Sequence, residues 1–236
     1  AHMAAHLNAK DISVVAVDLR GHGDSPGVRG AVDGYDDLRA DLAALLVQTH
    51  ELYPDHIPVL YGHSMGGGLV LDHGLSGTSK LRAIIASAPM IALPKPLNPL
   101  LRGAARLMAK LKPEATMPQP IEGDKVSTLP AEQKLYEDDP KNHGQLGFGL
   151  ANGMLINGEN IAAKAKSWHM PLLLMHSRDD QLTSFAASET FAKSAANTQF
   201  HAFENCAHEM HNDVPREQIY TLMTDFILAQ AAGKTA

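Results

Sequence analysis

The chain has 236 residues, of which 44% are hydrophobic and 19% are charged, and its formal net charge at pH 7 is −6. This length suits one sizeable core, or a core with a lid-sized insertion, and the mixture of apolar and charged residues excludes an intrinsically disordered chain. The net negative charge argues against a nucleic-acid-binding protein, which would normally carry an excess of basic residues.

The cysteine and hydropathy content point to a soluble cytoplasmic protein. Cys206 is the one cysteine, so no internal disulfide can form and the fold needs no oxidising compartment. No apolar run approaches the roughly 18 residues of a membrane-spanning helix, and no signal-peptide pattern opens the chain.

The first part of the chain alternates predicted strands with a helix. ISVVAVD at 12–18 is a continuous, largely β-branched run, which predicts a strand buried on both faces. Leucines at helical spacing predict a helix at 35–53, and further apolar runs predict strands at 57–62 and 81–87.

The last part of the chain continues the same alternation. Strands are predicted at 171–177 and at 198–204, and the alternating pattern of the second places it nearer a sheet edge. Helices are predicted at 183–196 and 215–231, with Pro215 suited to a helix start. Strands separated by helices predict an α/β fold with a parallel, doubly wound sheet.

Residues 88–166 interrupt this alternation, and we interpret them as a cap or lid inserted into a core formed by 1–87 and 167–236. Within this insertion, residues 97–112 have the pattern of a basic amphipathic helix. One side carries Leu97, Leu100, Leu101, Ala104, Leu107, Met108 and Leu111, and the other carries Arg102, Arg106 and Lys110. The default interpretation is a surface helix that packs its apolar face on the domain. The alternative is a cap element whose apolar face touches lipid and whose basic face meets phosphate headgroups.

GHSMG at 62–66 fits the pattern GxSxG between a predicted strand and a predicted helix. A serine on such a tight turn projects its hydroxyl above the sheet, and glycine is expected at both flanking positions because Cβ atoms would collide there. Ser64 is therefore the candidate nucleophile. The backbone N–H of Met65, at the start of the helix, is the candidate donor to an oxyanion.

A serine nucleophile needs a base, and the base needs an orienting acid. Catalytic groups gather at the carboxyl ends of parallel strands. Strand 171–177 is followed by Asp179 and Asp180, and strand 198–204 is followed by His208 and, one helical turn later, by His211. The order Ser, Asp, His along the chain is the order that α/β-hydrolases use. The spacing leaves either aspartate open as the acid and either histidine as the base.

The chain resembles the monoacylglycerol lipase and lysophospholipase branch of the α/β-hydrolases over nearly its whole length. The matching stretches are GHSMGG, VDLRGHGDSPG (17–27), the SAP after strand 81–87, YEDDP (136–140), PLLLMHSRDDQLTS (171–184) and HEMHNDVP (208–215). The resemblance implies that Ser64 is the nucleophile, Asp180 the triad acid and His208 the base. The family's spacing favours Asp180 over Asp179, although Ser177 stands where that spacing usually has a glycine.

The sequence departs from the family at its beginning. The family has three strands before the one predicted at 12–18, and an HGxG loop after the third supplies the second oxyanion donor. That third strand would lie between 12–18 and 57–61, which would otherwise lack a shared neighbour. We therefore expect the natural protein to carry an N-terminal segment missing from this sequence, through truncation, proteolysis or omission from the numbering. Residues 1–3 are either a remnant of a cleaved tag or the tail of the helix after that loop.

The resemblance implies a serine ester hydrolase that cleaves single-chain lipid esters, monoacylglycerol or lysophospholipid, through an acyl-enzyme. It implies no metal or organic cofactor, and the 13 histidines form no HExxH or Cys/His ligand pattern. Peripheral membrane contact through residues 97–112 follows from the alternative interpretation of that helix, as a lipid-facing cap element. A thioesterase, a carbon–carbon bond hydrolase, an acyltransferase, an aminopeptidase or a hydrolase-like binding protein without turnover remain the alternatives.

Overall fold

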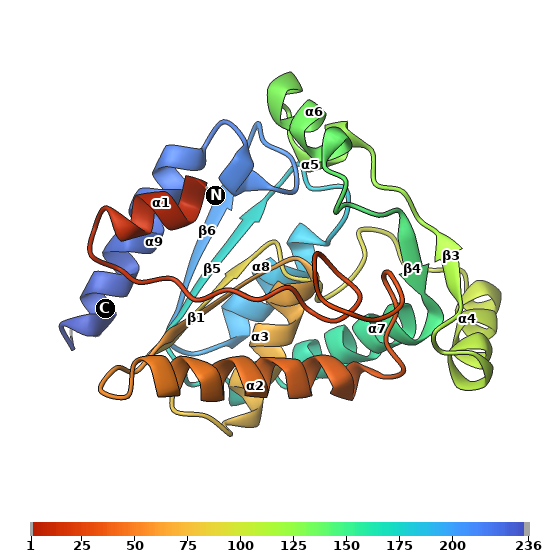
Figure 1. The fold of residues 1–236 in the computed structure, drawn as a ribbon, viewed down its shortest axis with the longest axis horizontal. Coiled ribbons are helices and arrows are strands. Elements are labelled where there is room, and N and C mark those ends of the chain that lie inside the picture. The colour runs from red at the N-terminus through yellow and green to blue at the C-terminus, as the bar shows by residue number, and fades with distance from the viewer. Residues whose placement is uncertain (1, 234–236) are drawn as a thin grey trace.

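The structure is a computed structural model that describes residues 2–233, and its helices and strands alternate along the chain (Figure 1). The α-helices are α1 (His2–Asn8), α2 (Tyr35–Leu52), α3 (Met65–Ser76), α4 (Pro99–Leu111), α5 (Gly123–Val126), α6 (Pro130–Asp138), α7 (Phe148–Ala163), α8 (Phe185–Ser194) and α9 (Arg216–Ala231). The strands are β1 (Val59–His63), β2 (Ala83–Ser87), β3 (Thr116–Pro118), β4 (Gln145–Gly147), β5 (Leu172–Ser177) and β6 (Thr198–Phe203). Two short 3₁₀ helices are η1 (Ala165–Ser167) and η2 (Met210–Asn212). No helix within residues 2–233 is both long and apolar enough to cross a lipid bilayer.

Strands β1, β2, β5 and β6 form a four-stranded parallel sheet in that spatial order. They correspond to the strands predicted at 57–62, 81–87, 171–177 and 198–204, and β6 lies at an edge as its alternating sequence predicts. Because the strands are parallel, their carboxyl ends lie at one edge of the sheet. The predicted parallel α/β fold is confirmed.

Successive side chains of the central strands enter two different hydrophobic clusters. Ile84 and Leu174 pack in one cluster with residues of α2, α3, α7 and α8. Ile85 and Leu173 pack in the other cluster with residues of α9. Figure 1 shows α1 and α9 together on one side of the sheet, with α2 and α3 on the other. Both faces of β2 and β5 are covered, which explains their almost entirely apolar sequences.

Residues 12–18 form no strand, contrary to the prediction. Their side chains are largely exposed, Val17 to 51%, where the sequence predicts burial on both faces. Within residues 2–233, no strand pairs with this segment, and β1 pairs only with β2. β-Branched residues favour an extended backbone, but a strand also needs a neighbour for its N–H and C=O groups. Among the described residues, this segment and β1 thus lack the shared neighbour that the family places between them.

Residues 88–166 lie between β2 and β5 in the chain and contain α4 to α7 together with the antiparallel pair β3–β4. Leu150 and Ile161 of α7 belong to the same hydrophobic cluster as α2 and α3. The end of the insertion is therefore packed on the helices that cover the sheet. The division into core residues 1–87 and 167–236 and cap residues 88–166 stays a prediction.

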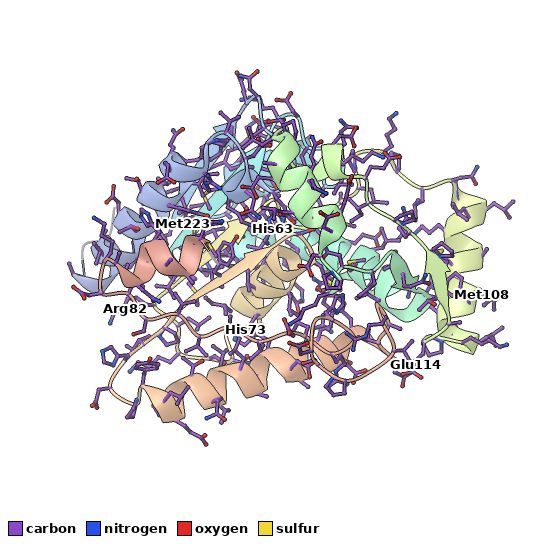
Figure 2. All side chains as sticks on the ribbon, turned by 45° about the horizontal axis from the view of Figure 1, so that its top comes forward. His63, His73, Arg82, Met108, Glu114 and Met223 are labelled. Atoms are coloured by element: carbon purple, nitrogen blue, oxygen red, sulfur yellow. The ribbon has the colours of Figure 1, made fainter. Side chains whose placement is uncertain are left out.

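Helix α4 lies within the helix predicted at 97–112, but its leucines do not pack on the domain. It lies beside α7 at one edge of the molecule, where Figure 2 labels Met108. Its strongly exposed residues include Leu100 at 84%, Leu101 at 59%, Leu107 at 56% and Leu111 at 68%. The default interpretation of this helix, burial of its apolar face, is wrong for these leucines, because α4 uses mainly the small residues Ala105 and Ala109, with Met108, on its partly buried side.

Candidate active site

Ser64 occupies the turn between β1 and α3, at the carboxyl edge of the sheet. Its backbone has φ 54° and ψ −117°, a conformation that a residue with a side chain rarely adopts. Hydrogen bonds from Ser64 N to Ser87 O and from Met90 N to Ser64 O, both 2.9 Å long, hold the turn. The backbone strain expected of a nucleophile elbow is therefore present at Ser64.

The glycines around Ser64 differ in how closely their neighbours approach. A Cβ at Gly62 would lie 2.2 Å from the carbonyl oxygen of Gly66, so no larger residue fits. At Gly66 a Cβ would meet nothing within 4 Å among the described residues outside its own helix, whereas at Gly67 it would lie 2.8 Å from Pro89 Cα. The predicted requirement for glycine is confirmed at position 62. It is wrong at position 66, because the close approach falls one residue later.

Met65 is the first residue of α3, so its backbone N–H has no carbonyl one turn earlier in the helix to bind. The helix dipole adds partial positive charge at the same end. An oxyanion formed beside Ser64 would meet a donor at this position. The second donor expected from an N-terminal loop stays a prediction.

Asp180 and His208 meet where the sequence places them, after β5 and after β6. Asp180 Oδ2 lies 2.7 Å from His208 Nδ1, and the two side chains are 0% and 6% exposed. The His208 ring lies 4.6 Å, centroid to centroid, from the ring of His63, the residue before Ser64. The structure thus joins Asp180 to His208 by a hydrogen bond and brings the His208 imidazole against the elbow that carries Ser64.

The Asp180 carboxylate is surrounded by hydrogen-bond donors. Oδ2 accepts from His208, from His176 Nε2 at 3.1 Å and from the Thr183 hydroxyl at 2.9 Å. Oδ1 accepts from the backbone N–H of Leu182 at 2.7 Å and of Thr183 at 3.0 Å. Burial by itself raises the pKa of Asp180, but the hydrogen bonds from His176 and His208 outweigh it and hold the pKa far below its usual range. Asp180 is therefore an ionised acceptor at neutral pH.

The alternative candidates for the acid and the base, Asp179 and His211, make different contacts. Asp179 accepts a hydrogen bond from Asn205 N at 2.8 Å and so joins the loops after β5 and β6. The His211 ring lies 4.8 Å from that of His63, and its Nδ1 is buried with no partner in the described part of the chain. Burial, together with the charge of His208, lowers the pKa of His211 to about 4. The hydrogen-bonded acid and imidazole are therefore Asp180 and His208.

Ser177 replaces the glycine that the family usually has at the end of this strand, and it connects the two loops that carry Asp180 and His208. Its hydroxyl donates to the carbonyl oxygen of Cys206 at 2.6 Å and accepts from the backbone N–H of Asp179 at 3.1 Å. The departure from the family pattern thus adds a contact between the ends of β5 and β6.

His63, labelled in Figure 2, is half-buried, and its ring lies beside the His208 ring. Its Nδ1 is 3.2 Å from the Ser87 hydroxyl, while its Nε2 is buried without a partner within residues 2–233. Burial, followed by repulsion from the charges on His208 and His211, holds the pKa of His63 well below its ordinary value. His63 is therefore neutral at neutral pH.

The loop that contains His208 is attached to the segment around α5. His208 N donates to Lys125 O at 3.2 Å. The buried Asp213 carboxylate accepts from the backbone N–H of Ala207 at 2.7 Å and from that of Thr128 at 2.8 Å. The position of the imidazole thus depends on contacts with residues 125–128.

Sequence reasoning missed three residues of this region, His176, Thr183 and Asp213. His176 lies in an apolar strand, where a lone histidine is indistinguishable from a core residue. The available signal was its spacing of four residues from Asp180, the carboxylate that it contacts. Asp213 belongs to the HEMHNDVP run, which supports the resemblance without indicating a role for the aspartate.

Comparisons with known proteins identify the family and the fold of the chain. A family model described as serine aminopeptidase, S33, matches residues 1–215. The chain is 27% identical over 231 residues to a monoacylglycerol lipase of Mycolicibacterium smegmatis, covering 97% of this chain and 82% of that protein. It is 30% identical over 230 residues to an uncharacterized abhydrolase domain-containing protein of Dictyostelium discoideum, covering 96% of this chain but 24% of that protein. The crystal structure of Paleococcus ferrophilus monoacylglycerol lipase matches with a TM-score of 0.89 at 22% identity, over 97% of this chain and 88% of that one. This match shows the α/β-hydrolase fold.

Proposed function

Because the chain belongs to the serine aminopeptidase S33 family of α/β-hydrolases, we propose that it is a serine ester hydrolase that cleaves single-chain lipid esters, monoacylglycerol or lysophospholipid. The observation that carries this proposal is the hydrogen-bonded pair of Asp180 and His208 beside the strained turn at Ser64. The names of the relatives from Mycolicibacterium smegmatis and Paleococcus ferrophilus support an ester of glycerol as the substrate.

In the first half of the reaction, the Ser64 hydroxyl attacks the acyl carbonyl carbon while His208 Nε2 takes the hydroxyl proton. The tetrahedral intermediate collapses as the bond to the glycerol oxygen breaks, and His208 returns the proton to that oxygen. The free alcohol leaves, and the acyl group stays on Ser64 as an ester. In the second half, His208 activates a water molecule that releases the fatty acid.

Asp180 has two roles in this scheme. Its hydrogen bond to Nδ1 holds the imidazole in the tautomer that leaves the Nε2 lone pair free to take the Ser64 proton. Its negative charge stabilises the imidazolium that forms when Ser64 loses its proton. The depressed pKa of Asp180 keeps that charge in place across the neutral range.

The oxyanion of the intermediate needs donors that are aligned before the reaction begins. We assign the Met65 backbone N–H as one donor, because it starts α3 directly after the nucleophile. Removal of one such donor lowers kcat by about 100- to 1,000-fold in a serine hydrolase where this has been measured. The arrangement of the second donor therefore decides how fast this chain turns over.

Helix α4 supports a lipid substrate. Its exposed leucines, with Arg106 and Lys110 exposed on the same helix, form the combination that binds at the surface of a bilayer. Such contact would bring the site to substrate that is dissolved in a membrane. Peripheral attachment through α4, in a protein of the cytoplasm, is part of this proposal, as is the cap role of residues 88–166.

The test is a comparison of initial rates over a set of substrates, with Ser64→Ala as the blank. The set contains monoacylglycerols, lysophospholipids, a short aryl ester, an acyl thioester and an aminoacyl anilide. We expect turnover of the monoacylglycerols and lysophospholipids that Ser64→Ala abolishes. Turnover of the anilide without turnover of any ester would replace this proposal with the aminopeptidase activity that the family description names.

A further inference from the structure

We propose that His176 is a positioning residue for the catalytic acid: its Nε2–H holds the oxygen of Asp180 that also binds His208, and Ser188, on the other ring nitrogen, holds the imidazole in place. This inference rests on the proposed function, because it concerns the same Ser64–His208–Asp180 site. His176 belongs to β5 and is wholly buried, and the catalytic scheme above does not use it.

The geometry places His176 between two fixed partners. Its Nε2 lies 3.1 Å from Asp180 Oδ2, and its Nδ1 lies 2.8 Å from the hydroxyl oxygen of Ser188 on α8. Ser188 is also wholly buried. The Phe185 ring is nearly perpendicular to the imidazole, with 5.8 Å between the ring centroids. The imidazole thus has a partner on each nitrogen and an aromatic neighbour.

The partners of the two nitrogens select one tautomer. An ionised carboxylate can only accept, so Nε2 must carry the proton that is shared with Asp180. A neutral imidazole then has its lone pair on Nδ1, and the Ser188 hydroxyl can donate to it. The Thr183 hydroxyl, 3.3 Å from Nε2, lies 2.9 Å from Asp180 Oδ2 and donates to that oxygen instead.

The consequence for catalysis lies in the shared oxygen. Asp180 Oδ2 accepts from His176 and His208 at once, so the carboxylate cannot rotate about its bond without breaking one of these contacts. The hydrogen bond from His176 also weakens the negative charge that Asp180 Oδ2 presents to His208. Without it, the full charge of Oδ2 would act on His208, and a proton would stay on His208 up to higher pH.

The decisive variant is the double mutant His176→Leu/Ser188→Ala, because the second change removes the hydroxyl that the first would leave buried without a partner. His176→Gln is the conservative variant, since its side-chain amide reaches the position of Nε2 and can still donate to Asp180. Ser188→Ala alone keeps the donation from Nε2 to Asp180 and removes only the hydroxyl that holds Nδ1. Circular dichroism and thermal unfolding show whether each variant folds.

For the double variant we expect kcat to fall by about tenfold, the contribution of one hydrogen bond to a buried charge, while KM is unchanged. We also expect the acid limb of its kcat/KM profile to move upward by about one pH unit. His176→Gln should restore both values, and Ser188→Ala should give a smaller shift. A merely structural role would lower activity by the same factor at every pH. A folded double variant with the wild-type kcat and the wild-type acid limb would overturn the inference.

A second measurement does not depend on turnover. In histidine-labelled wild-type protein, the ¹⁵N spectrum should show His176 as the neutral Nε2–H tautomer, and the double variant should shift the signal of the proton between His208 and Asp180. A neutral His176 with its proton on Nδ1 would overturn the inference. A wild type that hydrolyses no substrate would contradict the proposed function, and this spectrum would then decide the inference by itself.

Discussion

Asp213 accepts two hydrogen bonds from Thr128, one from the backbone N–H at 2.8 Å and one from the side-chain hydroxyl. The Asp213 carboxylate is almost fully buried and also accepts from the backbone N–H of Ala207, which precedes His208. One side chain thus joins the loop of the proposed base to a segment 85 residues earlier in the chain. The position of His208 is coupled to the insertion through this contact.

We expect Asp213→Ala to lower the free energy of unfolding by about 2 to 4 kcal/mol, because it leaves several buried N–H groups without an acceptor. The measurement is urea unfolding at pH 7. Asp138→Ala is the control, since Asp138 makes an exposed ion pair with Lys134 and should change stability by less than about 1 kcal/mol. Equal effects of the two substitutions would show that the Thr128 contact contributes nothing.

Asparagine substitutions at the adjacent residues Asp179 and Asp180 test which of the two is the catalytic acid. Asp180→Asn should lower kcat by roughly 10⁴-fold, as in serine proteases, because the amide cannot hold the His208 tautomer. Asp179→Asn should leave kcat within a few-fold, because Asp179 accepts from the backbone of Asn205 and, within residues 2–233, makes no hydrogen bond to a histidine. The reverse result would assign the acid to Asp179.

The depressed pKa of His211 predicts a loss of stability in acid. Burial lowers this pKa from 6.5 to about 4, so in that range the unfolded chain binds a proton that the folded chain does not. The contribution of His211 to the free energy of unfolding is therefore fully present above pH 6.5. It is lost as the pH drops toward 4, by on the order of 3 kcal/mol in total.

The variant His211→Phe removes this titration, so its urea midpoint should fall less than that of the wild type between pH 7 and pH 4. His56→Gln changes an exposed histidine and should follow the wild type. A His211→Phe curve parallel to the wild-type curve would mean that the His211 environment does not disfavour the charged ring.

The exposed leucines of α4 predict binding to lipid vesicles. Leu100→Ser/Leu107→Ser should weaken binding by about tenfold or more, because each buried leucine contributes roughly 1.5 to 3 kcal/mol. Anionic vesicles should bind more tightly than zwitterionic ones, and added salt should reduce that difference. Leu52→Ser is the control, because Leu52 is 58% exposed on α2. If both variants bind like the wild type, α4 is not the membrane contact.

The sequence predicts the sheet well where burial is regular. β2 and β5 are continuous apolar runs because both of their faces are covered, and the expected edge position of β6 follows from its alternation. The segment 12–18 is also a largely apolar run and forms no strand, because strand formation depends on a neighbour that local sequence does not report.

The candidate site is likewise predictable from the sequence only in part. Chain order and strand ends predict that an acid after β5 meets an imidazole after β6, since parallel topology brings those ends together, and the family resemblance chooses Asp180 and His208. They do not predict His176 or Asp213, whose partners come from α8 and from the insertion. The exposed leucines of α4 also lie beyond sequence reasoning, because a helical pattern shows that an apolar face exists and not what covers it.

The most direct test of the central claim is intact-mass and peptide analysis after treatment with a fluorophosphonate, which reacts with activated serines. We predict one adduct per chain, located on Ser64 and absent from Ser64→Ala, and a much slower reaction in His208→Ala. A well-folded wild type that forms no adduct, or one whose adduct lies on another residue, would contradict the assignment of Ser64 as the nucleophile.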